Sequence, residues 1–434
     1  MKNEKLKKAA EFILAEAGKQ GADPCQCAVT EKETKEFNVD GGDFSLMRTL
    51  FDYSVNITVI KDNKKGNVII NRLDEEALKQ AVCDCIASAE SAKPDTAWEL
   101  YAEKTEEEYV QGEPDCNTEK LFERSKEIKE TIGNDYPTLM VEQMITSHER
   151  VETQYMNTHG VSYATLAGFY EFSVGVNAHV GDKTSSMAYT GIRTEHLDKP
   201  VIELGGVRRM LIDTEKQLDT VPVSGKFTGT LVMTPNFSQM LVYLLDACFT
   251  GDGPLLEGTS MWKDKLGDLV ASDSLSIRVA PSDACIACGQ KYTGEGYPAK
   301  DYDLIKDGIL KSFSLSQYAA NRTKNKRAGN TSSAYIIPGG DKSVDEIIAG
   351  IDKGILVDRF SGGAPGANGE FSGVAKGAFM IENGKITDAL SETMISGNIL
   401  EGIKNIRAIS RETMEDGAMS TPYIAMEGIT ISGK

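Results

Sequence analysis

The sequence predicts an α+β fold: an N-terminal domain of helices packed on an antiparallel sheet, then a C-terminal, Gly-rich, mostly antiparallel β domain with a few helices. Three observations lead to this prediction. Apolar residues at helical spacing open the chain, segments of period-2 alternation fill much of the first half, and the second half is rich in Gly and in β-forming residues. The character changes in "LDTVPVSGKFTGTLVMTPN", so we place the domains at 1–222 and 223–434.

The elements of the first half follow from periodicity and from capping signals. An apolar stripe near the N-terminus predicts a helix that ends at Gly21, and Asp74 can cap a second helix. The predicted elements are a helix at 4–20, strands within 26–40 and 48–72 with a turn at 63–66, a helix at 75–91, an exposed acidic connection at 102–115, and a helix at 118–132 closed by Pro137.

The stretch "SHERVETQYMNTHG", residues 147–160, raises the question of a metal site because His148 precedes Glu149. A zincin helix needs two histidines about one turn apart, but His159 comes eleven residues after His148. The residues between them alternate as in a strand, and a turn signal ends at Gly160. We therefore predict a β-hairpin, with His159 at its tip and His148 at its entry.

Two helices are predicted in the second half. The segment "NFSQMLVYLLDACFTGDG" has a broad apolar face that includes Leu244 and Cys248, and Gly251 can terminate it. The other helix begins at Ser343, which forms a capping box with Glu346, and we expect it to end at Gly354.

The bulk composition excludes several classes of protein. A net charge of −18 opposes binding to a nucleic-acid backbone, and the basic stretch 321–330 is expected to be a solvated loop. No apolar run is long enough to span a membrane, and the charged N-terminus lacks the pattern of a signal peptide, so we expect a cytoplasmic protein. The eight cysteines are expected to be free and mostly buried, although Cys285 and Cys288 have the spacing of half a zinc knuckle.

Four ordered blocks of sequence resemble the TldD/PmbA family, also called the modulator of DNA gyrase family. They are "YMNTHGV" in the first half, "GTSMWKDKLGDLVASDSLSIRVAPSD" at 258–283, "GGAPGANGEFSGVAKGAFMIENGKITDALSETMISGNIL" at 362–400, and the terminal "IAMEGITISGK". The resemblance extends over the whole chain.

The resemblance also implies which branch of the family this chain is similar to. TldD-like members are zinc metalloproteases with an HExxxH helix and a later cysteine ligand, whereas PmbA-like (TldE-like) members lack these ligands. Counting back from Gly258 places the HExxxH positions at Tyr243, Leu244 and Cys248, and the later cysteine would fall within 417–420, "GAMS". A catalytic zinc needs about three protein ligands, and the second half contains no histidine. The chain therefore resembles the PmbA branch, and we expect it to bind no zinc itself.

In this family the PmbA-like chain resembles a partner of a TldD-like zinc protease that degrades or processes unfolded peptides. The resemblance implies a heterodimer or higher assembly with that protease, a homodimer when the chain is alone, and zinc only in the partner. The Gly-rich loop 361–369 followed by Glu370, Phe371 and Ser372 is our candidate lip of a peptide groove, and Gly369 and these three residues are the candidate peptide-binding residues. The alternative is that these glycines only build tight turns.

Three other functions remain as alternatives. The chain could be a thiol hydrolase that uses Cys248 or Cys288, with a histidine base contributed by the first domain. It could bind a metal through Cys285, Cys288 and first-domain histidines. It could also be a binding protein that modulates DNA gyrase, as the family's older name suggests.

Overall fold

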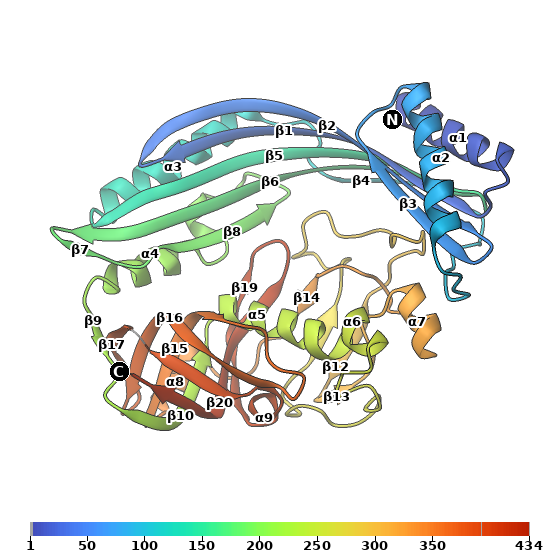
Figure 1. Ribbon diagram of the computed structural model, residues 1–434. Helices are drawn as coiled ribbons and strands as arrows, with labels where there is room; N and C mark the ends of the chain where they lie inside the picture. Colours follow the sequence, from blue (N-terminus) through green and yellow to red (C-terminus); the bar gives the residue numbers. More distant parts are fainter. Residues whose placement is uncertain (1–2, 392, 434) are drawn as a thin grey trace.

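Two β-sheets form the molecule, one from each half of the chain, and they lie one above the other in Figure 1. The structure is a computed structural model that describes residues 3–391 and 393–433. Helices pack on both sheets, so the fold is α+β, as the sequence predicted. Strand β9 already belongs to the second sheet, while the domain boundary near residue 222 stays a prediction.

The first sheet has the order β3-β2-β1-β5-β6-β4, and β7 and β8 also pair with β6. Its strands are antiparallel except for β4, which runs parallel to β6. The strands are β1 (Cys25–Asp40), β2 (Asp43–Lys61), β3 (Lys64–Ile70), β4 (Thr105–Gly112), β5 (Leu139–Asn157), β6 (Val161–Val180), β7 (Lys183–Thr184) and β8 (Ala188–Thr194).

Four α-helices accompany this sheet along the described chain, and they pack against its strands in two separate apolar clusters. Helices α1 (Glu4–Lys19) and α2 (Glu75–Ser91) pack at one end, where Leu6 and Leu78 meet β1 and β2. Helices α3 (Thr118–Asp135) and α4 (Val207–Lys216) pack toward the other end, together with the short 3-10 turn η1 (Val201–Glu203). Strands β1 and β5, which are 16 and 19 residues long, contribute side chains to both clusters.

The second sheet has the order β13-β12-β11-β14-β20-β10-β15-β16-β17-β9, with β18 and β19 attached to β16 and β20. It is mostly antiparallel, with parallel contacts at β10–β15, β14–β20 and β17–β9. The strands are β9 (Thr220–Pro222), β10 (Lys226–Met233), β11 (Ile277–Val279), β12 (Tyr302–Lys306), β13 (Ile309–Leu310), β14 (Tyr335–Ile336), β15 (Lys353–Gly362), β16 (Glu370–Glu382), β17 (Lys385–Ser391), β18 (Met394–Asn398), β19 (Ile406–Glu415) and β20 (Ser420–Ser432).

One helix, α5 (Pro235–Leu245), lies against the second sheet on the side that faces the first sheet (Figure 1). Its apolar face, including Leu241 and Leu245, belongs to the largest hydrophobic cluster of the protein. The other helices of this half are the π turn η2 (Asp246–Thr250), α6 (Asp252–Leu256), α7 (Gln317–Thr323), α8 (Val344–Ala349) and α9 (Ile399–Lys404). Within the described residues, no helix is both long and apolar enough to cross a membrane.

The hairpin predicted around the first two histidines is confirmed. Strands β5 and β6 pair in antiparallel register, and the turn between them ends at Gly160, whose φ is +85°. His159 lies at the tip as predicted. His148 does not lie at the entry of the hairpin: it sits in the middle of β5, and its side chain is buried. The error arose because β5 begins eight residues earlier than the alternation of the quoted stretch indicated.

Three other expectations for the first half can be compared with the structure. The helices at 4–20, 75–91 and 118–132 are confirmed to within a few residues. The acidic stretch 102–115 is not only a connection, because β4 pairs along its length with β6. The turn after β2 lies at Asp62 and Asn63, both with positive φ, so Gly66 lies in β3 and not in the turn.

Two expectations for the second half are confirmed only in part. The helical segment that begins at Pro235 does stop at Gly251 as predicted, but its last part, Asp246–Thr250, is a π turn, because the wider i→i+5 bonding begins at Asp246. The helix that starts after Ser343 keeps its predicted capping box but ends at Gly350, and Gly354 lies in β15. Gly354 is needed there because a Cβ would lie 2.4 Å from the carbonyl oxygen of Thr230 on β10.

Gly66 allows β3 and α2 to approach closely, since a Cβ at this position would lie 2.0 Å from the carbonyl oxygen of Cys85. We expect Gly66→Ala to lower the free energy of unfolding by about 1–3 kcal/mol through overpacking. Gly133→Ala is the matched control, because Gly133 lies in α3 with nothing near its Cβ position. That control should raise stability by up to about 1 kcal/mol through helix propensity. Urea denaturation measures both changes, and an unchanged midpoint for Gly66→Ala would contradict the expectation.

Candidate functional site

The positions that the sequence aligned with an HExxxH motif lie where α5 passes into a π turn. Tyr243 and Leu244 end α5, and Cys248 lies within the turn. The backbone N–H of Gly251 donates to the carbonyl oxygen of Asp246 at 2.8 Å, which is the i→i+5 bond of a π turn. The helix therefore widens within the five-residue interval that separates Tyr243 from Cys248. Such turns are rare in proteins and occur often at functional sites.

The side chains at these positions do not form a zinc site. Tyr243 is 48% exposed and packs edge-on against Tyr335, and Leu244 packs against the apolar cluster. Cys248 is half-buried and its Sγ lies 3.8 Å from the carbonyl oxygen of Pro365. Burial raises the pKa of the Cys248 thiol, so it stays protonated, whereas a zinc ligand must be a thiolate. One protonated thiol does not supply the donor set that a catalytic zinc requires.

The region of the expected later cysteine is also unsuited to a metal ligand at its first position. Gly417 has a φ of +82°, and a Cβ there would lie 1.9 Å from the carbonyl oxygen of Arg193. The remaining positions carry Ala418, Met419 and Ser420. Within residues 3–391 and 393–433, no three His, Cys, Asp or Glu side chains are grouped so that they could hold a metal ion.

A polar cluster that sequence reasoning missed lies beside the π turn. Asp246 is largely buried, and Thr250 Oγ1 donates to its Oδ1 at 3.1 Å. Burial raises the pKa of Asp246, and the hydroxyls of Ser314, Thr250 and Tyr335 oppose that rise. The available signal was an acidic residue in the middle of an apolar helical segment.

Asp416 joins this helix to the first sheet. Its backbone oxygen accepts from the N–H of Arg193 in β8 at 2.7 Å, and its Oδ2 accepts from Gln239 Nε2 of α5 at 2.7 Å. Its Oδ1 accepts from the N–H groups of Ala418 and Met419, which fixes the turn that it begins. One residue therefore ties α5, the turn after β19 and the edge of the first sheet together.

The Gly-rich loop predicted as the lip of a groove lies next to the π turn, since it contains the Pro365 oxygen that Cys248 contacts. The structure thus brings these two predicted regions together. The loop is a tight turn: the N–H of Gly366 donates to the oxygen of Glu370, and that of Gly369 to the oxygen of Gly366. Gly369 has a φ of +85°, so its glycine identity has a local backbone reason.

Glu370, Phe371 and Ser372 form the start of β16, and one edge of this segment is already paired with β18. On the opposite edge the pairing with β15 begins only at Gly373, but the backbone of Glu370 is already bonded within the loop: its oxygen accepts from Gly366 and its N–H donates to Asn368 Oδ1. The side chains of Glu370 and Ser372 are exposed. Phe371 packs edge-on against Phe360 at a centroid distance of 5.8 Å, and Phe360 stacks on Phe237 of α5. The groove therefore remains a prediction.

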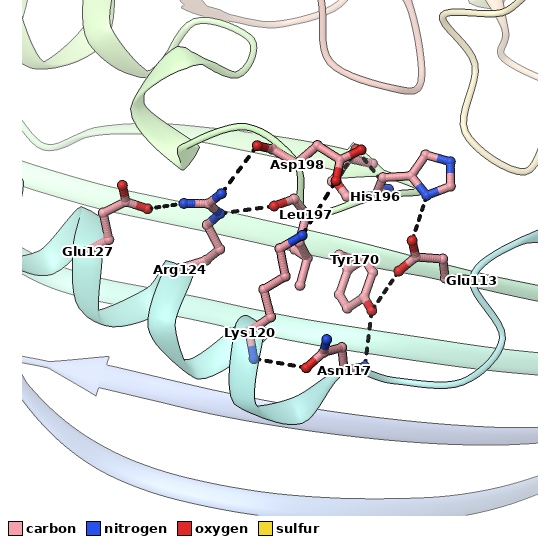
Figure 2. Close-up of polar contacts among 10 residues, drawn as sticks. Glu113, Asn117, Lys120, Arg124, Glu127, Tyr170, His196, Leu197 and Asp198 are labelled. Atoms are coloured by element: carbon pink, nitrogen blue, oxygen red, sulfur yellow. Dashed lines mark hydrogen bonds and ion pairs between the residues drawn. The ribbon is translucent and has the colours of Figure 1, made fainter.

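A network of hydrogen bonds surrounds Glu113 in the first half, as Figure 2 shows. His196 Nδ1 lies 2.7 Å from Glu113 Oε1, and the hydroxyl of Tyr170 donates to Glu113 Oε2 at 3.1 Å. The hydrogen bond to Glu113 raises the pKa of His196. His148 lies beneath this network: its Nε2 is 2.7 Å from the Glu113 backbone oxygen, and burial lowers its pKa.

The same network fixes the segment after β8 on helix α3. Arg124 Nε donates to the backbone oxygen of Leu197 at 3.1 Å, and Lys120 Nζ pairs with Asp198 at 3.4 Å (Figure 2). Arg124 also binds Glu127 one turn further along the helix. We interpret these contacts as structural, because His148 and His196 both bond to Glu113.

Each cysteine of the Cys285-Ile-Ala-Cys288 segment lies close to an acidic residue: Cys285 to Asp283 and Cys288 to Glu195. The backbone N–H of Cys288 donates to Glu195 Oε1 at 2.8 Å, and its Sγ lies 3.7 Å from the oxygen of Gly168. Burial and Glu195 raise the pKa of Cys288 to about 12. Burial and Asp283 raise the pKa of Cys285 to about 12. A nucleophilic cysteine needs the opposite environment, in which a positive group lowers its pKa.

Three neighbouring cavities follow the seam between the two sheets, with volumes of about 550, 230 and 720 Å³. The cavities are neighbours along this seam: the first two share the lining residues Ser186, Gln217 and Gly377, and the second and third share Gly205, Thr413 and Met414. We call this row of three cavities the inter-sheet trough. Its wall on the first sheet is formed by β8, α4 and their connections.

The sequence and the fold can now be compared with known proteins. Residues 224–433 match the family model for the PmbA/TldA metallopeptidase C-terminal domain. The metalloprotease PmbA homolog of Haemophilus influenzae is 23% identical over 99% of this chain and 96% of its own length. The chain belongs to the TldD/PmbA family.

Other members of the TldD/PmbA family agree with this assignment. The metalloprotease PmbA of Escherichia coli O157:H7 is 25% identical over 92% of this chain and 88% of its own length. Among solved structures, TldE from Thermococcus kodakarensis superposes with a TM-score of 0.86 at 22% identity, covering 98% of this chain and all of that one. A Bacteroides thetaiotaomicron protein named as a candidate modulator of DNA gyrase gives 0.85, at 22% identity and 99% coverage of both chains. These likenesses establish a shared fold.

The raised pKa values lead to a prediction about thiol reactivity. A pKa of about 12 lowers the thiolate fraction of Cys285 and Cys288 near neutral pH by about 1,000-fold relative to an ordinary cysteine. We expect iodoacetamide at pH 7.5 to leave both unmodified in the folded protein while it alkylates glutathione in the same tube. Mass spectrometry of the proteolytic peptides measures the modification, and urea-unfolded protein is the control. Rapid alkylation of either cysteine in the folded chain would restore the thiol hydrolase alternative.

Proposed function

We propose that this chain is the non-catalytic, PmbA/TldE-like subunit of a TldD-type zinc metalloprotease complex that degrades or processes unfolded peptides in the cytoplasm. The observation that carries the proposal is the end of α5. The chain shares the family's scaffold, but the positions that the resemblance aligns with HExxxH hold Tyr243 and Leu244 in α5 and Cys248 in the π turn. In this proposal zinc is bound only by the TldD-like partner.

A feature of the first sheet supports the proposal of a partner subunit. Residues 43–54 of β2 pair with β1 on one side only, because β3 pairs with β2 from Val55 onward. This free edge carries exposed apolar side chains on both faces: Phe44, Leu46, Met47, Leu50 and Phe51. A long apolar edge is a liability in an isolated protein and is a favourable surface for pairing with another chain. We therefore propose residues 43–54 as the contact to the protease partner, or to a second copy when the chain is alone.

Co-purification from the native host tests the proposal. We expect a tagged chain to retain a TldD-like metalloprotease in near-equal amount. Protein isolated alone, without chelator, should contain zinc well below one ion per chain by elemental analysis, and should leave casein intact. Stoichiometric zinc or casein cleavage by the lone chain would contradict a non-catalytic role. Recovery of gyrase in place of a protease would favour the gyrase alternative.

The proposed contact can be tested with a matched pair of variants. Phe51 in β2 and Leu269 in the second half are both 65% exposed. We expect Phe51→Lys to weaken the association about tenfold or more, because a charge replaces an apolar contact in the interface. Leu269→Lys should leave the association unchanged. Analytical ultracentrifugation with the purified partner measures both affinities, and equal affinities for the two variants would exclude the β2 edge as the contact.

A further inference from the structure

Strand β8 has a free edge that faces the second sheet. It pairs with β6 on one side, and this antiparallel ladder uses the backbone groups of alternate residues. The N–H of Arg193 donates away from β6, to the oxygen of Asp416 at 2.7 Å. By the two-residue period of a strand, the N–H and C=O groups of Tyr189 and Gly191 point to the same side as that N–H.

The two ends of this edge are held by the second half of the molecule, while its middle is free. Arg359 Nη2 donates to the oxygen of Met187 at 2.8 Å, and the Arg359 guanidinium lies 4.9 Å from the centre of the Tyr189 ring. At the other end is the bond from Arg193 to Asp416. Between them, the backbone N–H and C=O groups of Tyr189 and Gly191 make no hydrogen bond within the described chain, and both residues are exposed.

We propose that this segment of β8 is a docking edge for an extended, unfolded peptide, which pairs with the backbone of Tyr189 and Gly191 and lies in the inter-sheet trough. This inference rests on the proposed function, because it assigns to this subunit a place where the unfolded substrate is held.

The position and chemistry of the edge favour this occupant. Residues before it, such as Ser186 and Ala188, line the cavity of about 230 Å³, and residues after it, such as Ile192 and Thr194, line the cavity of about 720 Å³. A chain paired with the edge therefore has space at both ends. Tyr189 and Gly191 span about 7 Å of strand and offer two donors and two acceptors at the spacing of a β-ladder. An extended backbone of any sequence supplies the complementary groups.

Asp416 provides a local model for the contact. Its carbonyl oxygen already makes with Arg193 the bond that an added strand would make. A peptide at Tyr189 and Gly191 would extend the same ladder by about three residues. Gly191 suits this role, because it has no side chain and nothing lies within 4 Å of its Cβ position.

Substitution of Gly191 tests the contribution of its backbone N–H to peptide binding. Proline lacks the N–H that faces the trough, and proline is tolerated in a strand when its N–H would face away from the ladder. Alanine keeps the N–H and fits the open space, so Gly191→Ala is the matched control. We expect Gly191→Pro to weaken the binding of a fluorescein-labelled peptide of about 12 residues by about tenfold, and Gly191→Ala to bind as the original chain does. Fluorescence anisotropy measures both affinities.

Two further measurements keep the outcome clear. The same peptide with N-methyl groups on its central residues should fail to bind, because it cannot form a ladder. Hydrogen exchange with residue resolution should show slower exchange at Tyr189 and Gly191 when the unmodified peptide is added, with no change at Thr190, which faces β6. Circular dichroism checks that Gly191→Pro is folded, and if it is not, the exchange and N-methyl results on the original chain decide.

The results distinguish this inference from the proposed function. Equal affinities of folded Gly191→Pro and Gly191→Ala, or unchanged exchange at both amides, would overturn the docking edge. Protection that appears only with the protease partner, and not with the peptide, would also overturn it and would make β8 a subunit interface. If no protease co-purifies but the peptide still protects Tyr189 and Gly191, the proposed function fails and the docking edge stands.

Discussion

The contact between Asp416 and the edge of the first sheet is the constraint on which the rest of the arrangement depends. The backbone of Asp416 bonds to β8, its carboxylate holds α5 through Gln239, and the turn that it begins places Gly417 against Arg193. The space there has no room for a side chain at Gly417. The position of α5 relative to the first sheet is therefore fixed by a contact that a metal-binding side chain at this glycine would disrupt.

The end of α5 is held in place by contacts within the protein. The π turn is held by the backbone bond from Gly251 to Asp246 and by the apolar packing of α5, and neither depends on an ion. Aromatic packing of Tyr243 on Tyr335 and the polar cluster at Asp246 stabilise the region. Burial and hydrogen bonding thus supply the local order that metal ligation would supply in a zinc site.

Much of the fold could be predicted from the sequence, because local patterns encode it. The helix caps at Asp74 and Ser343 and the hairpin turn at Gly160 each depend on residues close together in the chain. Strand β4 was missed because its exposed acidic residues lack the alternation that marks a half-buried strand. The π turn was missed because the apolar pattern of α5 continues through it.

The candidate site could be predicted only in part. The family resemblance identified Tyr243 and Cys248 as positions of interest. The contact of Cys248 with Pro365 of the Gly-rich loop could be found only from the structure. Contacts such as Cys288 with Glu195 join residues far apart in the sequence that share no local pattern. The free edge of β8 could not be predicted from local sequence either. Which strand edges are unpaired depends on the strand order of the whole sheet.

The two apolar clusters of the first sheet have a consequence for how the first half loses its structure. Each cluster has its own pair of helices, and only the continuous strands connect them. We therefore expect disruption of the packing of α1 and α2 to leave the burial around α3 and α4 intact, so that the two ends of the sheet unfold as separate cooperative units. The terminal unit can therefore open and close while the half of the sheet that meets Asp416 keeps its shape.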